Sequence, residues 1–242
     1  MSDRRVVIAG GGGTLGAALV DGFAAAGAKL AAIDVSAKAL AELAQRGVVA
    51  IEADLRDPAA CRDAVASARQ QLGGLDVFVH CVGINDRRPL EDYDDALWDA
   101  IIATNLSSAF HTATAAAGGM REQRDGRIIF FSSVAGRSGH KLHGPYAATK
   151  GAINQLMRVM AHEYAAEGVT VNAVAPGYMD TALTADYLAT HPGRREALTE
   201  LIPAGRFGTI QEVLDPVLFL ASPRASFITG QVLYIDGGRT VI

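Results

Sequence analysis

Short runs of apolar residues alternate along the chain with longer segments whose apolar residues recur at helical spacing. The short runs predict seven strands, at Arg5–Ala9, Lys29–Ile33, Val48–Glu52, Val77–Cys81, Arg127–Ser132, Thr170–Ala175 and Val232–Ile235. The longer segments predict helices at Leu15–Ala26, Ala37–Gln45, Pro58–Leu72, Asp95–Met120, Tyr146–Glu167 and Gln211–Ala221. Continuously apolar strands separated by helices are typical of a parallel sheet covered on both faces. We therefore predict an α/β fold, a doubly wound parallel sheet with right-handed crossovers.

One segment departs from this alternation. Between Gly177 and Gly208, short helical pieces are broken by Pro192, Gly193 and Pro203. A long irregular segment in a compact domain usually serves function, so we predict a substrate lid around residues 178–208. No linker, repeat or low-complexity tract divides the rest of the sequence, and residues 1–242 are predicted to form a single domain.

Charge and composition disfavour several classes of partner. The formal net charge is −4, whereas a nucleic-acid-binding surface is basic, so we expect no nucleic-acid partner. The longest uncharged span, Ala100–Met120, contains an asparagine, a histidine, two serines and three threonines, which fits a buried helix rather than a membrane span. Cys61 and Cys81 lack metal-ligand spacing. We therefore expect reduced core thiols, no bound metal and a cytoplasmic protein that does not bind membranes.

A glycine-rich turn joins the first predicted strand to the first helix, running from Gly10 to Gly13 and then through Thr14, Leu15 and Gly16. Glycine lets the backbone approach a pyrophosphate, and the unpaired N–H groups of a helix N-terminus favour its negative charge. A glycine pattern alone is weak evidence, because any tight turn can require glycine. Its place between strand and helix strengthens the prediction that these residues bind a dinucleotide.

Asp34 ends the second predicted strand, 18 residues after Gly16. A carboxylate at this position accepts hydrogen bonds from the adenosine ribose hydroxyls of a dinucleotide. A 2′-phosphate would bring further negative charge beside it, and Val35, Ser36 and Ala37, not an arginine, come next. We therefore predict NAD as the cofactor in preference to NADP. The alternative, in which Asp34 caps the following helix, is weaker because Ser36 fills that role better.

Tyr146 and Lys150 open a helix directly after Gly144 and Pro145. A separation of four residues places both side chains on one helical face. A free phenol titrates near pH 10, and a nearby ammonium would lower the pKa of Tyr146 toward neutrality. Alone, this spacing is common on helix surfaces. In a dinucleotide-binding domain it predicts that Tyr146 donates and accepts the proton of a redox reaction.

The order and spacing of several motifs resemble those of the short-chain dehydrogenase/reductases over essentially the whole chain: the glycine turn, Asp34, Asp54, Ser133, Tyr146, Lys150, Pro176–Gly177 and the closing Asp236–Gly238. The resemblance implies a Rossmann fold and an oxidoreductase that moves a hydride between nicotinamide and a secondary alcohol or ketone. It also implies a homotetramer built through two long helices and the C-terminal strand.

The resemblance assigns catalytic roles by position. Ser133, 13 residues before Tyr146, would polarise the substrate oxygen. Lys150 would also bind the nicotinamide ribose, and Asn105 would hold a water that connects Lys150 to solvent. The neighbouring Ser132 lies one step out of register and is expected to be structural. Further cofactor contacts implied by the resemblance are Asp54 at the adenine amino group, Leu55, Gly83, Pro176, Gly177, the backbone of Met179 and the hydroxyl of Thr181.

The sequence also departs from the family pattern in two places. Thr14 stands where the glycine turn usually has a glycine, and it adds a hydroxyl near the pyrophosphate. His80 and Cys81 replace two asparagines after the fourth strand. A catalytic histidine or a reactive cysteine is an alternative, but we expect both residues to be packed in a hydrogen-bonded core.

The substrate is indicated less strongly. Arg87 and Arg88 follow the fourth strand, and an arginine can bind a carboxylate through two parallel hydrogen bonds. His143, just before Tyr146, is placed to meet a hydroxyl. The stretch 84–90, together with residues 177–179 and 202–208, resembles the sugar-acid (gluconate-type) dehydrogenases. We predict Ser133, His143, Tyr146 and Arg88 as substrate contacts. One alternative is an NADPH-dependent 3-oxoacyl-carrier-protein reductase, which Arg194 and Arg195 favour. Another is a catalytically silent dinucleotide-binding protein.

Overall fold

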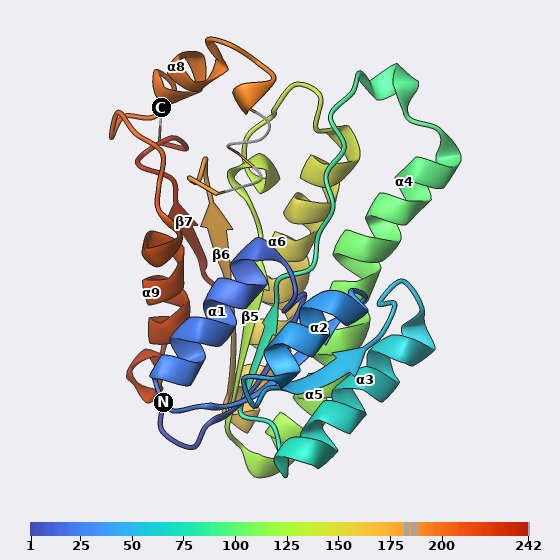
Figure 1. Cartoon of the computed structure of the whole chain (residues 1–242). Helices are drawn as coiled ribbons and strands as arrows, with labels where there is room; N and C mark the ends of the chain where they lie inside the picture. The colour runs from blue at the N-terminus through green and yellow to red at the C-terminus, as the bar shows by residue number, and fades with distance from the viewer. Residues whose placement is uncertain (182–183, 185–187, 242) are drawn as a thin grey trace.

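The computed structural model describes residues 1–181, 184 and 188–241. Its centre is one parallel sheet of seven strands in the order β3-β2-β1-β4-β5-β6-β7 (Figure 1). The strands are β1 Arg5–Ala9, β2 Lys29–Asp34, β3 Val49–Glu52, β4 Val77–His80, β5 Gly126–Phe131, β6 Val169–Pro176 and β7 Val232–Ile235. This architecture confirms the predicted doubly wound α/β fold, and each strand end lies within a few residues of its predicted position.

Helices cover both faces of the sheet (Figure 1). One face carries α1 (Thr14–Ala25), α2 (Ala37–Ala44) and α9 (Ile210–Ala221), and the other carries α3 (Pro58–Leu72), α5 (Ser108–Gln123) and α6 (Gly144–Tyr164). Two further helices, α4 (Asp95–Ile102) and α8 (Arg194–Thr199), lie toward the carboxyl ends of the strands. Short 3₁₀ turns occur at Leu90–Asp92, Val134–Gly136, Ala165–Glu167 and Pro223–Ala225.

The central strands are mostly apolar because each faces two cores. Val7 and Ala9 of β1 pack under α3 and α5, whereas Val6 and Ile8 pack under α1 and α9, and all four are fully buried. Successive side chains of a strand point to opposite faces, so a strand covered on both sides is apolar at most of its positions. The continuous apolar pattern in the sequence follows from this arrangement.

The chain reverses its direction of winding between β1 and β4, which are neighbours in the sheet. From β1 the chain proceeds outward to β2 and β3, and from β4 it proceeds outward to β5, β6 and β7. The loops after β1 and β4 therefore diverge, and a crevice opens at the carboxyl edge of the sheet, where ligands of doubly wound folds bind.

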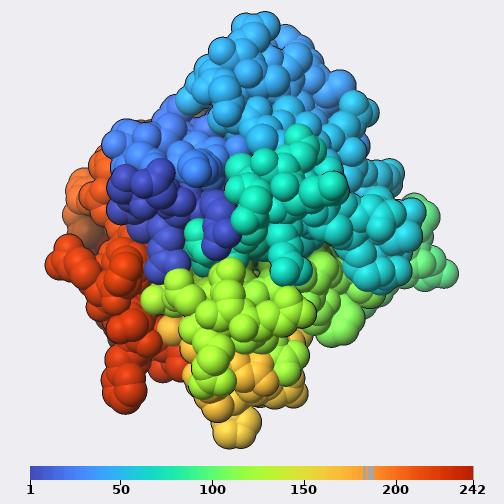
Figure 2. Space-filling model, turned by 90° about the horizontal axis from the view of Figure 1, so that it is seen from below, coloured from blue at the N-terminus to red at the C-terminus, as the bar shows by residue number. Residues whose placement is uncertain are grey.

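Ion pairs cross the opposite side of the sheet, at the amino ends of the strands. Arg4 pairs with Asp125, Arg5 pairs with Asp76, and the buried Arg127 binds Asp125 at 2.9 Å. Figure 2, which views the molecule from below, shows the N-terminal residues among segments from the middle of the chain on this face. The chemistry predicted from the sequence lies at the other edge.

The predicted single helix Asp95–Met120 is wrong. α4 ends at Ile102, a π-helical turn occupies Ala103–Ser107, and α5 begins at Ser108. A π-turn adds one residue to the helix and leaves the apolar periodicity on either side intact, so the sequence pattern did not reveal it. No helix in the described part of the chain has the length and apolar character needed to cross a bilayer.

Candidate active site

The glycine turn brings backbone very close to backbone. Gly10 has φ of 82°, a left-handed conformation that favours glycine. A Cβ on Gly16 would lie only 2.0 Å from Gly10 O, so α1 can approach the turn only with glycine at this position. The first turn of α1 has Gly13 as its N-cap, with no side-chain hydrogen bond to the helix. Its N–H groups, at Thr14 and Leu15, form the kind of cradle that a pyrophosphate requires.

Asp34 lies across this turn and is held by backbone. Its Oδ2 accepts a hydrogen bond from Gly12 N at 2.8 Å, and its Oδ1 accepts one from Ser36 N at 3.0 Å. Each carboxylate oxygen keeps a free lone pair for a ligand hydroxyl. Ser36 caps α2 through Ala39 N, as predicted, so Asp34 does not act as the side-chain cap of that helix.

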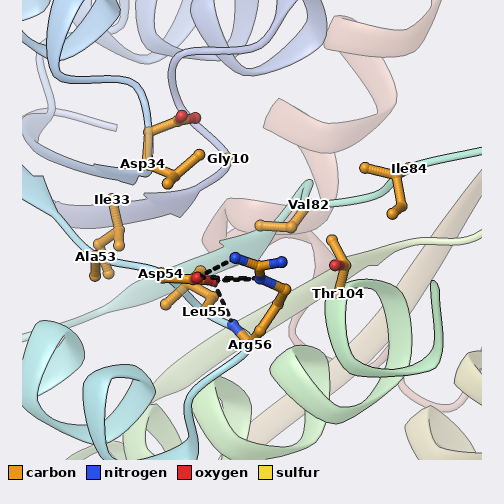
Figure 3. Close-up of a pocket in the computed structure, with 11 residues that line it drawn as sticks. Gly10, Ile33, Asp34, Ala53, Asp54, Leu55, Arg56, Val82, Ile84 and Thr104 are labelled. Carbon is orange, nitrogen blue, oxygen red and sulfur yellow. Dashed lines mark hydrogen bonds and ion pairs between the residues drawn. The ribbon is translucent and has the colours of Figure 1, made fainter. Parts of the chain in front are cut away.

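A pocket runs from Asp34 along the carboxyl edge of the sheet (Figure 3). Its walls come from four successive segments after β1, β2, β3 and β4 and from the π-turn, and are mostly apolar. The lining residues are Gly10, Ile33, Asp34, Val35, Ala53, Asp54, Leu55, Arg56, Val82, Ile84 and Thr104. An apolar slot that ends on a carboxylate, beside a helix N-terminus, fits the adenosine half of a dinucleotide.

Arg56 is a pocket residue that the sequence analysis missed. Its guanidinium binds Asp54 through both carboxylate oxygens, at 3.0 and 2.6 Å, and points into the pocket (Figure 3). The same interaction lowers the pKa of Asp54. Leu55 between them is buried, and its carbonyl accepts a hydrogen bond from Cys61 Sγ. The only signal in the sequence was an arginine two residues after Asp54, which carries little information without the fold.

Tyr146 and Lys150 share one face of α6, as their spacing predicts. Lys150 Nζ lies 5.5 Å from the centre of the Tyr146 ring and donates a 2.8 Å hydrogen bond to Phe131 O at the end of β5. The lysine side chain is buried, and burial lowers its pKa to about 8. An amine this close to its titration point can give and take protons near neutral pH.

The pKa of Tyr146 differs from the expectation. Burial raises it, and the opposing effects come from a hydrogen bond with Ser133 and the charge of Arg87, rather than from Lys150. The Lys150 ammonium packs against the face of the ring and is held by Phe131 O. The phenol of this fold is therefore a proton donor at neutral pH, and its deprotonation depends on groups that contact its oxygen.

Ser133 faces Tyr146 from the N-terminus of the 3₁₀ turn Val134–Gly136. Its Oγ accepts a hydrogen bond from Ala135 N at 3.2 Å, and it bonds to the phenol of Tyr146. Ser132 Oγ instead donates to Lys150 O at 3.3 Å, inside the fold. The expected division between the two serines, one facing the site and one structural, agrees with these contacts.

Asn105 stands in the π-turn and fastens it to the loop after β4. Its Oδ1 accepts a hydrogen bond from Ile84 N at 2.8 Å, and its Nδ2 donates to Ile84 O at 2.9 Å and to Thr149 Oγ1 at 3.2 Å. Gly83 lies beside it, where a Cβ would be 3.4 Å from Lys150 Nζ and 3.6 Å from Asn105 Oδ1. The structure thus places Asn105, Gly83 and Lys150 together.

The predicted nicotinamide segment begins at the end of β6. Gly177 N donates to Ile235 O at 2.9 Å, directly after Pro176. Gly208 forms a parallel bridge with Met179: its N–H donates to Tyr178 O, and its C=O accepts from Asp180 N. The N–H and C=O of Met179 therefore point away from Gly208. Thr181 Oγ1 accepts a hydrogen bond from Thr184 N. Part of the predicted lid, at residues 182–183 and 185–187, lies outside the residues that the structure describes.

Of the two adjacent arginines, Arg88 is not the one that faces the reaction. It binds Asp86 through two hydrogen bonds of 2.6 and 2.8 Å and lies over the ring of Tyr93, so the structure does not support the predicted contact between Arg88 and substrate. The charge of Arg87 instead acts on both Tyr146 and His143. The sequence did not show that Asp86 would bind Arg88.

His143 packs its ring edge-on against Tyr146, with 6.2 Å between the centres. Its Nδ1 lies 2.7 Å from Lys141 O. A carbonyl can only accept, so Nδ1 carries the proton and the neutral ring leaves Nε2 as an acceptor. Burial lowers the pKa of His143, which favours this neutral form. The group is suited to accept a hydrogen bond from a substrate hydroxyl.

The departures from the family pattern are accommodated within the fold. Thr14 is exposed in the first turn of α1. Burial raises the pKa of the Cys81 thiol to about 12 and that of Cys61 to about 11, so neither thiol is reactive at neutral pH. His80 is fully buried, and the same burial lowers its pKa to about 3. These shifts make neither the two thiols nor His80 suited to act as a catalytic acid, base or nucleophile.

Comparison with known proteins identifies the family. A family model described as enoyl-(acyl carrier protein) reductase matches residues 12–240. The 2-(S)-hydroxypropyl-CoM dehydrogenase 3 of Xanthobacter autotrophicus is 37% identical over 100% of this chain and 98% of its own length. The 3-oxoacyl-(acyl-carrier-protein) reductase of Escherichia coli is 34% identical over 99% of this chain and 98% of its own.

The chain belongs to the short-chain dehydrogenase/reductase family. A crystal structure of a gluconate 5-dehydrogenase from Burkholderia cenocepacia, in complex with NADP and tartrate, is similar to it with a TM-score of 0.92 at 33% identity, covering 100% of this chain and 97% of that one. This short-chain dehydrogenase/reductase is thus an oxidoreductase that acts on a secondary alcohol or ketone with a nicotinamide dinucleotide. The close backbone at Gly16, the uncapped α1 and the pocket ending at Asp34 fit such a cofactor.

Proposed function

We propose that this enzyme uses NAD to interconvert a secondary alcohol and a ketone on a sugar or sugar acid. The observation that carries the cofactor choice is the position of Asp34, which faces the pocket with both oxygens held by backbone N–H groups. Backbone anchoring holds the carboxylate in place, where it suits two ribose hydroxyls and repels a 2′-phosphate.

The chain's own groups perform the proton chemistry. When bound, the nicotinamide dinucleotide supplies or accepts the hydride. Tyr146 gives its phenolic proton to the substrate oxygen or receives it, while Ser133 donates a hydrogen bond to that oxygen. Lys150, whose pKa is lowered, restores the proton of Tyr146 and lies beside Gly83 and Asn105. Asn105 contributes by holding the Ile84 loop against the lysine and is proposed to hold the relay water.

A polyhydroxylated, anionic substrate is supported by the groups around the phenol. His143 offers an acceptor at Nε2, and Arg87 contributes a positive charge that acts on Tyr146 and His143. Arg194 adds positive charge on His143 from the lid segment. We propose that these groups bind the hydroxyls and the carboxylate of a sugar acid, and that residues 178–208 cover it.

The alternative substrate, a 3-oxoacyl group on a carrier protein, is kept because of the Escherichia coli relative. A docking surface for an acidic carrier needs available basic side chains near the lid. Arg195 is engaged with Asp180 and lies over the Phe207 ring, which leaves Arg194 as the basic residue of this pair. The intact set of Ser133, Tyr146 and Lys150 argues against the catalytically silent alternative.

We further propose a homotetramer. Trp98 on α4, Phe110 on α5 and Val159 on α6 are each more than two-fifths exposed, and Phe227 before β7 is fully exposed. Large apolar side chains gathered on neighbouring helices usually mark an interface. Sedimentation of the purified enzyme tests this, and a monomer at micromolar concentration would contradict it.

The function is tested by two measurements. Calorimetric titration with NAD and with NADP measures the cofactor preference, and tighter binding of NADP would contradict the role of Asp34. A panel of sugar acids, neutral polyols and 3-oxoacyl thioesters, followed by the absorbance of reduced nicotinamide, identifies the substrate class. Turnover of the thioesters alone would favour the carrier-protein alternative.

A further inference from the structure

The buried His80 at the end of β4 has no place in the proton chemistry described above. Its Nε2 lies 2.9 Å from Ser108 Oγ at the start of α5. Ser108 Oγ in turn donates a 2.5 Å hydrogen bond to Thr104 O, inside the π-turn. A histidine, a serine and a backbone carbonyl thus form a short chain of hydrogen bonds from the sheet to the turn that carries Asn105.

The π-turn creates the carbonyl that this chain of bonds satisfies. The backbone N–H of Ser108 bonds to Ala103 O, five residues earlier, instead of to Thr104 O, four residues earlier. Thr104 O thereby loses the donor that an α-helix would supply at this place. The side chain of Ser108 replaces that donor. A buried carbonyl without a partner is costly, so the serine stabilises the π-turn over a regular helix.

The direction of these bonds fixes the protonation of His80. A serine hydroxyl has one proton, and Ser108 gives it to Thr104 O. His80 must therefore donate from Nε2, which leaves Nδ1 without a proton and, among the residues that the structure describes, without a hydrogen-bond partner. With the pKa lowered to about 3 by burial and by the charge of Lys150, the imidazole keeps this form across the working pH range.

A second connection joins the same two segments next to the site. Ile84, four residues after His80, is held through its backbone by Asn105, three residues before Ser108. The bonds His80–Ser108 and Ile84–Asn105 therefore close a small frame around Gly83, whose neighbours are Lys150 Nζ and Asn105 Oδ1. If one side of the frame loosens, the other side loses its register.

We propose that His80 is a positioning residue that, through Ser108, holds the π-turn in the register that places Asn105 beside Lys150. The inference rests on the proposed role of Asn105 in the proton relay. It explains why a histidine and a serine, rather than two apolar residues, occupy fully buried positions at this junction.

The first test removes the two donors separately. His80→Leu keeps bulk and loses the N–H, His80→Gln restores an amide donor near the position of Nε2, and Ser108→Ala removes the hydroxyl. We expect the Leu and Ala variants to lower kcat by about tenfold or more, because a displaced catalytic group is costly, with KM for the cofactor unchanged. His80→Gln should recover most of the rate. Ser107→Ala, in the same turn and with no side-chain hydrogen bond recorded in the described structure, is the matched control and should behave as wild type.

The second test asks whether His80 acts through Asn105. In an Asn105→Ala background, Ser108→Ala should cost no further activity, because the group that it positions is already absent. Hydrogen exchange of residues 103–108 should accelerate in His80→Leu and Ser108→Ala and stay normal in Ser107→Ala. Multiplicative losses in the double variant, or a lowered Tm with unchanged kcat, would overturn the inference. Full activity of Asn105→Ala would instead contradict the relay role of Asn105, and with it the inference, while leaving the cofactor and substrate assignments to their own tests.

Discussion

Lys150 holds its ammonium 5.5 Å from the centre of the Tyr146 ring, and the same nitrogen is bound to Phe131 O at the end of β5. The lysine is therefore fixed by the sheet rather than by the tyrosine. Both residues lie near the N-terminus of α6, and the Lys150 side chain is buried. Burial acts on the two in opposite directions, since it raises the pKa of the phenol and lowers that of the amine.

Removal of the phenolic hydroxyl isolates its chemical role. Tyr146→Phe should lower kcat by roughly a hundredfold or more, because the group proposed to transfer the proton is removed. Binding of NAD should be nearly unchanged, since the ring and its packing against Lys150 and His143 remain. Steady-state kinetics with calorimetry of NAD binding measure both quantities. Wild-type turnover in this variant would contradict the assignment of the proton donor.

The lowered pKa of Lys150 predicts how stability changes with pH. In the fold the amine titrates near 8, and its ordinary value is 10.5. Below pH 8 both states carry the proton and the folded state bears the full cost of a buried charge. Between pH 8 and 10.5 only the unfolded chain keeps the proton, so the stability of wild type relative to Lys150→Met should rise with pH.

The size of that rise is of order 3 kcal/mol, at about 1.4 kcal/mol for each unit of pKa difference. Urea denaturation of both proteins from pH 7 to 10.5 measures it. Lys38→Met, which removes an exposed lysine on α2, should show no such change relative to wild type. A flat difference for Lys150→Met would mean that the amine titrates normally in the fold.

Sequence reasoning predicted the fold because the strands are short, mostly apolar runs and the segments between them have apolar residues at helical spacing. It also predicted that Tyr146 and Lys150 share a helical face, since helical spacing is a local property, whereas Ser133 was assigned by the resemblance to the family. Asp34 was predictable because strand ends at one edge of a parallel sheet meet at the crevice. In each case a short stretch of chain determines where the side chain goes.

The features that sequence reasoning missed depend on contacts between distant segments. The π-turn around Asn105 is joined to the β4 histidine through Ser108, and Arg56 enters the pocket because β3 lies beside β2. Asp86 binds Arg88, a contact that the sequence pattern did not reveal. These choices depend on energies of tertiary contacts that no periodicity records.

The two arginines provide a matched pair for the substrate. Arg87→Gln should lower kcat/KM for a carboxylate-bearing substrate by about tenfold, because a charge-assisted contact near Tyr146 and His143 is lost. For a neutral polyol the same variant should change little. Arg88→Gln should leave both values near wild type, since Arg88 is already occupied by Asp86. Equal effects of the two variants would contradict the placement of Arg87 at the substrate.

Asp34→Ala tests the choice between the two cofactors. Loss of the carboxylate removes acceptors for the ribose hydroxyls and the repulsion toward a 2′-phosphate, so the ratio of NAD to NADP affinity should fall by about tenfold. Calorimetry with each dinucleotide gives the ratio. The loss of contacts to Gly12 and Ser36 also affects the turn, so thermal denaturation must show that the variant is folded at the temperature used. An unchanged ratio would show that Asp34 does not read the ribose.

Arg56 should act on the same ratio in the opposite sense. Arg56 is a cation among the residues that line the pocket, where its side chain is exposed and pairs with Asp54. Its removal in Arg56→Ala should weaken NADP more than NAD, because the cofactor with the additional phosphate loses more from the missing charge. Screening by solvent limits the change in the ratio to roughly threefold.

The control is Arg62→Ala, which removes an exposed arginine on α3 that does not line this pocket. A shift of the same size in both variants would indicate a general effect of net charge, whereas a shift toward NADP in Arg56→Ala would show that the guanidinium opposes the phosphate.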